Sequence, residues 1–261
     1  MTAAINRTLS ALELLSRHPQ GLAVQSVATS LGLAPSAAYR LLNDLRQAGY
    51  VRQDPESAAY GLTIRLAGLG LSWLGLTGIP DVCQPVLDDL AKLSGELVRL
   101  SVSDGERLVW VAFAQGATAG LRYDPVREQG VEASLAYSAS GRAWVATLDP
   151  DRSHLLLEKQ GLTPPDGAAE NSRLTMEQAL SLVSRAKSSG HAEAVDCFLA
   201  GMAAVAVPLT SGNSAPGCLS IAGPAVRLTA GRRAELLPAL RAAASGIAAI
   251  LPASAFFRGL R

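Results

Sequence analysis

Apolar residues recur at helical spacing through the first third of the chain. A stripe of Ile and Leu at spacings of three and four predicts a helix over residues 5–16. Pro19-Gln20-Gly21 interrupts this pattern, and a shorter stripe predicts a second helix over about 24–31. Gly32-Leu33-Ala34 then makes a tight turn before a third helical segment. Two helices joined by a short turn that contains glycine are typical of a helix-turn-helix.

The third segment, residues 34–49, has a polar face that suits DNA. Pro35 fits the first helical position, because its missing N–H would have no partner there, and Gly49 fits the exit. An apolar face is formed by Ala38, Leu41, Leu42 and Leu45. The groups off that face can contact phosphates and base edges, and they belong to Ser36, Ala37, Tyr39, Arg40, Asn43 and Gln47. The alternative is an ordinary amphipathic surface helix.

The residues after Gly49 favour the DNA-binding interpretation. Two short extended runs, Tyr50–Gln53 and Ala59–Leu62, flank the turn-like segment Asp54–Ser57. They predict a β-hairpin, or wing, on which Arg52 would hold a phosphate. Three helices followed by a wing are a more specific pattern than any one helix.

Residues 64–76 are apolar and rich in glycine, and they predict a helix. Small residues at Gly68 and Gly75 would let another helix approach closely. We interpret this segment as a linker helix that also supports dimerisation. The alternative is a helix that packs only within its own chain.

From Pro80 onward, strand-like and helical patterns alternate, which predicts an α+β or α/β domain of about 180 residues. Asp104-Gly105 marks a hairpin, and Thr175 with Gln178 fits a capping box. Helices are expected at 81–94, 140–148, 150–160, 176–188 and 230–250, and strands at 96–103, 107–114, 119–123, 202–209 and 216–222.

Composition agrees with a folded protein in a reducing compartment. The 261 residues are 49% hydrophobic and 17% charged, with a formal net charge of +1. Residues 1–75 hold six Arg, no Lys and four acidic residues, a local balance of +2. Three widely spaced cysteines form neither a disulfide framework nor a metal motif, and we expect a cytoplasmic protein.

The chain shows no segment suited to a membrane. The uncharged apolar-rich run between Arg65 and Asp81 is shorter than the roughly 20 residues that a bilayer needs, and it is interrupted by glycines. The N-terminal stretch follows Arg7 with a helical pattern and lacks the apolar core of a signal peptide. We therefore expect no membrane span.

Catalytic and cofactor motifs are lacking. The three histidines share no metal-ligand spacing, and there is no P-loop, GxGxxG or GxSxG. Ser138–Arg142 instead suggests small residues at a helix N-terminus, where backbone N–H groups can approach an anion. Arg142 could add charge or point to solvent, and Ser220 could face the same cavity or be a core hydroxyl. We expect no cofactor, no metal and no enzymatic activity.

At this point the chain resembles the IclR family of bacterial transcriptional regulators along nearly its whole length. In the first half the resemblance rests on Arg7–Leu15, Val27–Ser36, Tyr39–Leu45 and Gly49–Val51. In the second half it rests on Ser138–Ala143, Gly190–Ala192, Gly201–Pro208 and Leu219–Pro224.

The resemblance implies an α+β protein in three parts. Residues 1–63 would form a winged helix-turn-helix, 64–79 a linker and dimerisation helix, and 80–261 a GAF-like α/β effector-binding domain. Such regulators are usually homodimers or dimers of dimers on palindromic operators in double-stranded DNA, and their effectors are mostly small carboxylates or aromatic acids. The residues that the family places at the effector are here Ala139, Ser140, Gly141, Ala204, Ser220 and Ala222.

Several positions depart from the family pattern. Ser138 and Arg142 replace the usual Thr and Lys, and Ala194 stands where some members have a carboxylate, although Asp196 is near. Ala204 and Ala222 replace the cysteine and second serine of glyoxylate-type pockets. We therefore expect a roomier, less polar pocket and a larger organic or aromatic acid.

Two hypotheses result for the function. In the first, the protein is an effector-controlled transcription factor in which Ser36, Ala37, Tyr39, Arg40 and Asn43 face the major groove. In the second, it is a small-molecule-sensing or hydrolytic protein that uses Ser138, Ser140 and Ser220, with an incidental N-terminal interaction module. Salt-dependent DNA affinity would separate them.

Overall fold

The computed structural model of the protein describes residues 3–117, 120–123, 129–170, 172–211 and 214–250. The chain forms two compact units, Met1–Leu76 and Thr77–Arg261. No helix in the described ranges is long and apolar enough to cross a bilayer.

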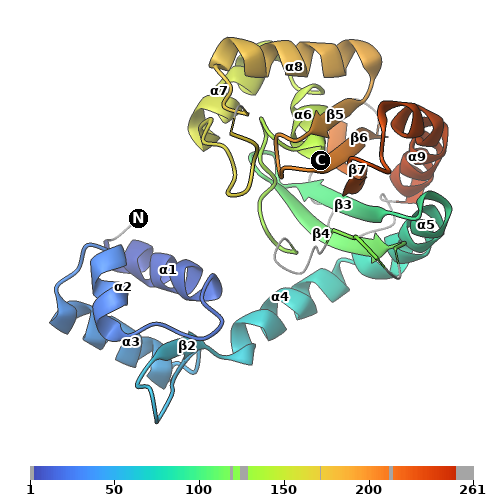
Figure 1. The fold of residues 1–261 in the computed structure, drawn as a ribbon. Helices are drawn as coiled ribbons and strands as arrows, with labels where there is room; N and C mark the ends of the chain where they lie inside the picture. Colours follow the sequence, from blue (N-terminus) through green and yellow to red (C-terminus); the bar gives the residue numbers. More distant parts are fainter. Residues whose placement is uncertain (1–2, 118–119, 124–128, 171, 212–213, 251–261) are drawn as a thin grey trace. The chain divides into compact units, whose positions relative to one another are not determined.

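The N-terminal unit is a three-helix cluster with a β-hairpin (Figure 1). Pro35 lies in the first turn of the third helix, and Gly49, with φ of 81°, follows its end in the left-handed conformation that glycine favours. In chain order the elements are α1 (Ala3–Ser16), α2 (Val24–Ser30), α3 (Pro35–Gln47), β1 (Val51–Gln53), β2 (Tyr60–Leu62) and α4 (Ile64–Leu76). The buried core that holds them together consists of Ala11, Leu15, Val27, Leu42, Leu45, Val51 and Tyr60.

The hairpin is the expected wing. Strands β1 and β2 pair antiparallel, with Val51 opposite Leu62. Leu22, which precedes α2, exchanges two backbone hydrogen bonds with Tyr60 and so attaches the helices to the wing. Gly21 is required at this point, because a Cβ there would lie 2.9 Å from the carbonyl oxygen of Tyr60. At the wing tip the carboxylate of Asp54 accepts hydrogen bonds from the backbone N–H and the hydroxyl of Ser57 and from the backbone N–H of Glu56, and these bonds lower its pKa.

The C-terminal unit is built on a five-stranded antiparallel sheet of order β4-β3-β7-β6-β5. Helices α5 and α9 cover one face, and α6 covers the other with α8 packed on it and α7 against α8 (Figure 1). Its elements are α5 (Ile79–Ser94), β3 (Leu97–Ser103), β4 (Leu108–Gln115), α6 (Ala139–Val145), α7 (Pro150–Gln160), α8 (Met176–Ser189), β5 (Ala192–Val195), β6 (Met202–Ser211), β7 (Ser214–Pro224) and α9 (Ala230–Ile250). The architecture is the expected α+β combination of a winged helix-turn-helix and an α/β unit.

One predicted strand was wrong, and one strand was missed. The expected strand over 119–123 is a bend in its described part, Gly120–Tyr123, because side chains rather than a neighbouring strand hold its carbonyl groups. Strand β5, only four residues long, was not predicted, although it forms an edge of the sheet beside β6. Residue 119 of the predicted strand, and residues 212 and 213 of the segment expected between the last two strands, lie outside the described residues.

Candidate functional site

Helix α3 presents a polar face to solvent in the N-terminal unit. Its apolar side buries Ala38, Leu42 and Leu45 in the core. Opposite them, Ser36, Tyr39 and Arg40 are exposed, and Ala37 is half-buried. Arg52 on the wing strand β1 is exposed as well. A hydroxyl, a phenol and two guanidinium groups are thus available on the helix-turn-helix and its wing.

Asn43 differs from the other residues expected on that face. It is half-buried, and its side-chain oxygen is covered by protein and has no hydrogen-bond partner among the described residues. That oxygen is therefore not offered to solvent in this conformation. A role for Asn43 in reading bases stays a prediction.

Arg65, which sequence reasoning did not single out, fixes the exit from the helix-turn-helix. Its Nη1 donates to the carbonyl of Ala48 at 3.0 Å, and its guanidinium carbon lies 5.0 Å from the ring centroid of Tyr50. Arg65 is in the first turn of α4, so these contacts attach the start of α4 to the end of α3. The sequence feature that could have indicated Arg65 is its position as a single arginine at the start of an apolar helix.

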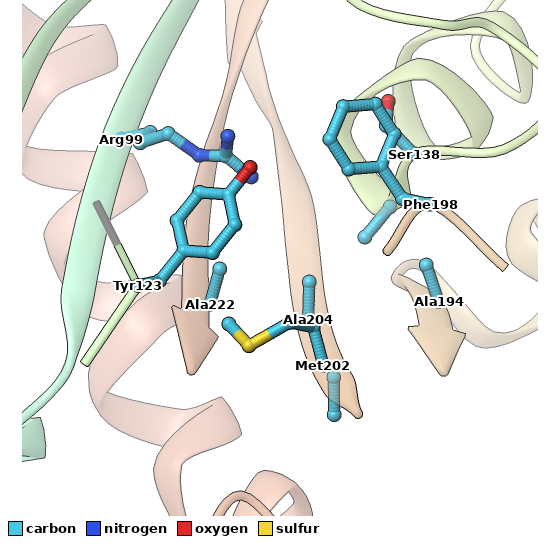
Figure 2. A pocket seen from close by; sticks show the side chains of 10 residues that line it. Arg99, Tyr123, Ser138, Ala194, Phe198, Met202, Ala204 and Ala222 are labelled. Carbon is cyan, nitrogen blue, oxygen red and sulfur yellow. The ribbon is translucent and has the colours of Figure 1, made fainter. Parts of the chain in front are cut away.

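A pocket opens in the C-terminal unit between the sheet and the N-terminus of α6. The space not filled by protein atoms is about 330 Å³, part of it open to solvent, but water-sized molecules can occupy only about 20 Å³. That is about the room that one water molecule needs. Figure 2 shows the side chains of the residues that line it, which are Arg99, Tyr123, Ser138, Ala139, Ala194, Phe198, Met202, Ala203, Ala204 and Ala222.

The small residues expected at the pocket are partly brought together. Ala139, Ala204 and Ala222 line it, as does Ala194, where some relatives have a carboxylate. The pocket is accordingly apolar on these walls. It is not roomy in this conformation, in which the larger side chains of Phe198, Met202 and Tyr123 also line it (Figure 2).

Ser140, Gly141 and Ser220 are buried beside the pocket but are not among its lining residues. Gly141 is needed for packing, because a Cβ there would collide with the backbone of Ser134 and Leu135. Ser220 donates a long hydrogen bond of 3.4 Å to the carbonyl of Arg99. These three residues support the pocket wall in this structure. That they contact an effector stays a prediction.

Ser138 lines the pocket, yet its hydroxyl is engaged in the local backbone. It caps α6 by accepting from the N–H of Gly141 at 2.9 Å, and it donates to the carbonyl of Ser134 at 2.6 Å. A hydroxyl that already makes both bonds is not positioned as a nucleophile.

Arg142 neither faces the pocket nor points to solvent. It is buried, and its guanidinium donates to the carbonyls of Ala136 at 2.6 Å and Glu193 at 2.7 Å. Its third contact is to the sulfur of Cys197 at 3.3 Å. Arg142 therefore ties α6 to β5 and the loop that follows it.

The charged group at the pocket is Arg99, which sequence reasoning missed. It projects from β3, is only 5% exposed, and reaches into the pocket beside Tyr123 (Figure 2). Its guanidinium carbon lies 4.3 Å from the ring centroid of Trp110 and 5.6 Å from that of Tyr123. A single charged residue inside an otherwise uncharged strand was the signal that could have indicated it.

The segment Gly120–Tyr123 borders the pocket and is attached at two points. The side-chain amide of Gln115 donates to the carbonyl of Tyr123, and Nη1 of Arg227 donates to the carbonyl of Leu121, each at 2.7 Å. Arg227 is itself held by two bonds to the buried carboxylate of Glu96, which raises the pKa of its guanidinium. These contacts hold the ring of Tyr123 at the pocket.

In the described ranges, no three histidine, cysteine or acidic side chains gather closely enough to hold a metal ion. The buried thiol of Cys218 lies in the core cluster on the α6 side of the sheet, and its burial raises its pKa well above the ordinary value. It is therefore a packing residue at neutral pH.

A winged helix-turn-helix with an exposed polar helix, joined in one chain to an α/β unit with a pocket, defines a class: DNA-binding transcriptional regulators. Comparison with protein families gives the particular group. Residues 4–55 match the IclR helix-turn-helix domain, and residues 72–249 match the C-terminal domain of the bacterial transcriptional regulator IclR. The chain belongs to the IclR family of transcriptional regulators.

Individual relatives agree with this assignment. The chain is 30% identical over 246 residues to the glycerol operon regulatory protein of Streptomyces coelicolor, covering 92% of this chain and 91% of that protein. It is 26% identical to the transcriptional regulator XynR of Escherichia coli over 211 residues, 81% of each chain.

Solved structures share the fold. An IclR transcriptional regulator from Alicyclobacillus acidocaldarius superposes with a TM-score of 0.79 at 23% identity, over 95% of this chain and 98% of that one. An IclR homologue from Microbacterium hydrocarbonoxydans, complexed with 4-hydroxybenzoate, gives a TM-score of 0.76 at 20% identity, over 97% and 100% of the two chains.

Proposed function

We propose that this transcriptional regulator changes its DNA binding when the pocket of its C-terminal unit takes up a small organic acid. The observation that carries the proposal is a pocket with apolar walls and a buried cation, in the same chain as a helix-turn-helix whose polar face is exposed. We expect it to act in the cytoplasm.

The chemistry of the walls favours an acid with an apolar body, such as an aromatic carboxylate. Alanines and aromatic rings surround the space, and the Microbacterium relative was crystallised with 4-hydroxybenzoate. Because the present space is narrow, such a ligand would have to displace Phe198 or Met202. Ligand entry would thereby be coupled to a change in the protein.

Dimers, or dimers of dimers, would bind palindromic operators through paired helices α3, as family membership suggests. In each copy, Ser36, Ala37, Tyr39, Arg40 and Asn43 would meet the major groove and Arg52 a phosphate. The acid would alter the relative placement of the two reading helices through α4. It can do so only if it binds one arrangement more tightly than the other.

The proposal is tested by selecting an operator from random DNA and measuring binding by fluorescence anisotropy at several salt concentrations. Affinity should fall steeply as salt rises, because phosphate contacts release counterions. If Arg40 makes a bidentate base contact, Arg40→Ala should cost about 1–3 kcal/mol on the selected site and little on random DNA. Arg52→Ala should weaken both sites alike.

Arg185→Ala, the loss of an exposed charge on α8, serves as the matched control and should leave affinity unchanged. Salt-independent affinity would reject DNA binding. Equal loss for the Arg40 and control variants would reject the assigned reading face. A hydrolytic function is not favoured, since the hydroxyls of Ser138 and Ser220 are bonded to backbone groups.

A further inference from the structure

We propose that Thr63 and Arg65 hold the reading helix α3 rigidly to α4, and that they thereby set the spacing of the two operator half-sites that paired copies can bind. The inference rests on the proposed function, because it concerns how paired α3 helices meet DNA. It adds two positioning residues that need not touch a base, and it assigns them a measurable effect on specificity.

The end of α3 and the start of α4 are joined through three consecutive carbonyl groups. The carbonyl of Ala48 accepts a hydrogen bond from Nη1 of Arg65 at 3.0 Å. The carbonyls of Gly49 and Tyr50 accept from the hydroxyl and the N–H of Thr63, at 2.6 Å and 2.9 Å respectively. The carbonyl groups at the end of a helix have no partner within it, so residues outside α3 satisfy them here. We call these contacts the α3–α4 joint.

The hydroxyl of Thr63 serves both helices. Besides donating to the carbonyl of Gly49, it accepts from the N–H of Arg65 at 3.3 Å, in the first turn of α4. Thr63 is also the one residue between β2 and α4, so α4 can turn relative to the wing only about the backbone of Thr63. Both bonds of its hydroxyl oppose such a turn.

The guanidinium of Arg65 fastens the joint to the core of the N-terminal unit. Its carbon lies 5.0 Å from the ring centroid of Tyr50, and Tyr50 packs against the buried core. Gly49 leaves room for this arrangement, because a Cβ there would lie 3.1 Å from Nη1 of Arg65. A cation is also favoured at a helix C-terminus, where the dipole is negative. The end of α3 and the first turn of α4 should therefore move as one piece.

Stiffness at the joint matters because α4 is a lever. No residue of α4 is buried in the single chain, so packing along its later turns does not fix its direction. Its 13 residues make a rod of about 20 Å at 1.5 Å per residue. A rotation of about 10° at the joint would move the far end by roughly 3 Å, close to the rise of one base pair. In copies paired through α4, the joint would thus fix the distance between the two reading helices.

The test measures how strongly binding depends on half-site spacing. An operator is selected from random DNA with the full-length protein, and its central spacer is lengthened or shortened by one and by two base pairs. Fluorescence anisotropy then gives the affinity for each DNA and for a DNA with a single half-site. The wild type should lose on the order of tenfold or more on the altered spacers, whereas Arg65→Met and Thr63→Val should lose about threefold or less. On the single half-site all three proteins should bind alike, because the reading face is unchanged.

Conservative variants and a control keep the test decisive. Arg65→Lys keeps a cation for the ring of Tyr50 and a donor for the carbonyl of Ala48, and Thr63→Ser keeps the hydroxyl, so both should restore the wild-type dependence on spacing. Arg17→Met, which removes the charge of an exposed arginine after α1, should keep that dependence as well. Sedimentation velocity checks that each variant still pairs. Should Arg65→Met not fold, the comparison of Thr63→Val with Thr63→Ser decides.

Each outcome separates the two proposals. Equal dependence on spacing in the wild type and in both variants overturns the role of the joint and leaves the regulator proposal standing. A loss of affinity that is the same on every DNA, the single half-site included, also overturns it, because Arg65 would then act as a phosphate contact. Wild-type binding that is indifferent to spacer length has the same consequence. Absence of salt-dependent binding to any DNA overturns the proposed function itself, and the role of the joint with it.

Discussion

Two buried arginines of the C-terminal unit lie near the pocket but differ in what their guanidinium groups contact. Arg142 donates to two backbone carbonyls, so its charge serves the local fold. Arg99 stacks on aromatic rings and lines the pocket. The sequence motif drew attention to Arg142, because it follows a turn of small residues. Which of two arginines enters a cavity depends on sheet register and packing, which linear spacing does not specify.

Gly141 provides a residue-scale prediction that separates packing from ligand contact. A Cβ at this position would meet the backbone of Ser134 and Leu135, which cannot move as a side-chain tip can. Gly141→Ala should therefore lower the free energy of unfolding by about 1–3 kcal/mol, as overpacking does. Urea denaturation of the variant without ligand measures the effect.

The control is Gly246→Ala on α9, where an added Cβ meets nothing within 4 Å. Because alanine is the better helix former, this change should be neutral or stabilise by up to about 1 kcal/mol. Equal stability of Gly141→Ala and the wild type would contradict a packing role and leave ligand contact as the reason for a glycine there.

Elements with a capping residue or a long apolar period were predictable from sequence. Helices α4, α7 and α8 begin and end within a residue of their predicted limits, because apolar periodicity and local cap chemistry fix them. Strand β5 and the 120–123 bend were not, because a short edge strand and a bend are both defined by the groups they contact in the fold: Ala203 for Val195, and Arg227 for Leu121. The pocket is likewise lined by residues that only the folded chain brings together.

The capping box of α8 gives the prediction at this scale. The Thr175 hydroxyl accepts from the N–H of Gln178, and the Gln178 side chain accepts from the N–H of Thr175. Thr175→Ala should destabilise the protein by about 1 kcal/mol, as loss of an N-cap does. Chemical denaturation measures this change in the free energy of unfolding, with a spectroscopic probe that reports on the C-terminal unit alone.

Gln178→Ala and the double variant complete a mutant cycle. The two changes should be less than additive, because each removes part of one reciprocal contact. Full additivity would show that the two side chains act independently and that the box contributes no coupling.

At the scale of the whole molecule, regulation requires that an event in one unit reach the other. Each unit has its own core, and the boundary falls between Leu76 and Thr77, at the end of α4. None of the residues of α4 is buried in the single chain. Large apolar side chains stand exposed along it, among them Ile64 at 83% and Leu76 at 80%. Exposed apolar surface of this extent usually marks an interface, so we expect another protein surface to cover α4.

We predict that α4 is covered by a second copy of the chain, because dimers are expected for this family. Leu71→Glu should then dissociate the dimer. Leu71 is 65% exposed in the single chain. In a symmetric interface each substitution occurs twice, and burying one leucine contributes about 1.5–3 kcal/mol, so dissociation should become at least on the order of a hundredfold easier. Sedimentation velocity over a range of protein concentrations measures this dissociation.

The control is Ser184→Glu, which adds the same charge on the exposed side of α8 and should leave the dimer intact. An unchanged sedimentation coefficient for Leu71→Glu would place α4 against its own chain only, and the coupling between pocket and reading helix would then have to run through other contacts.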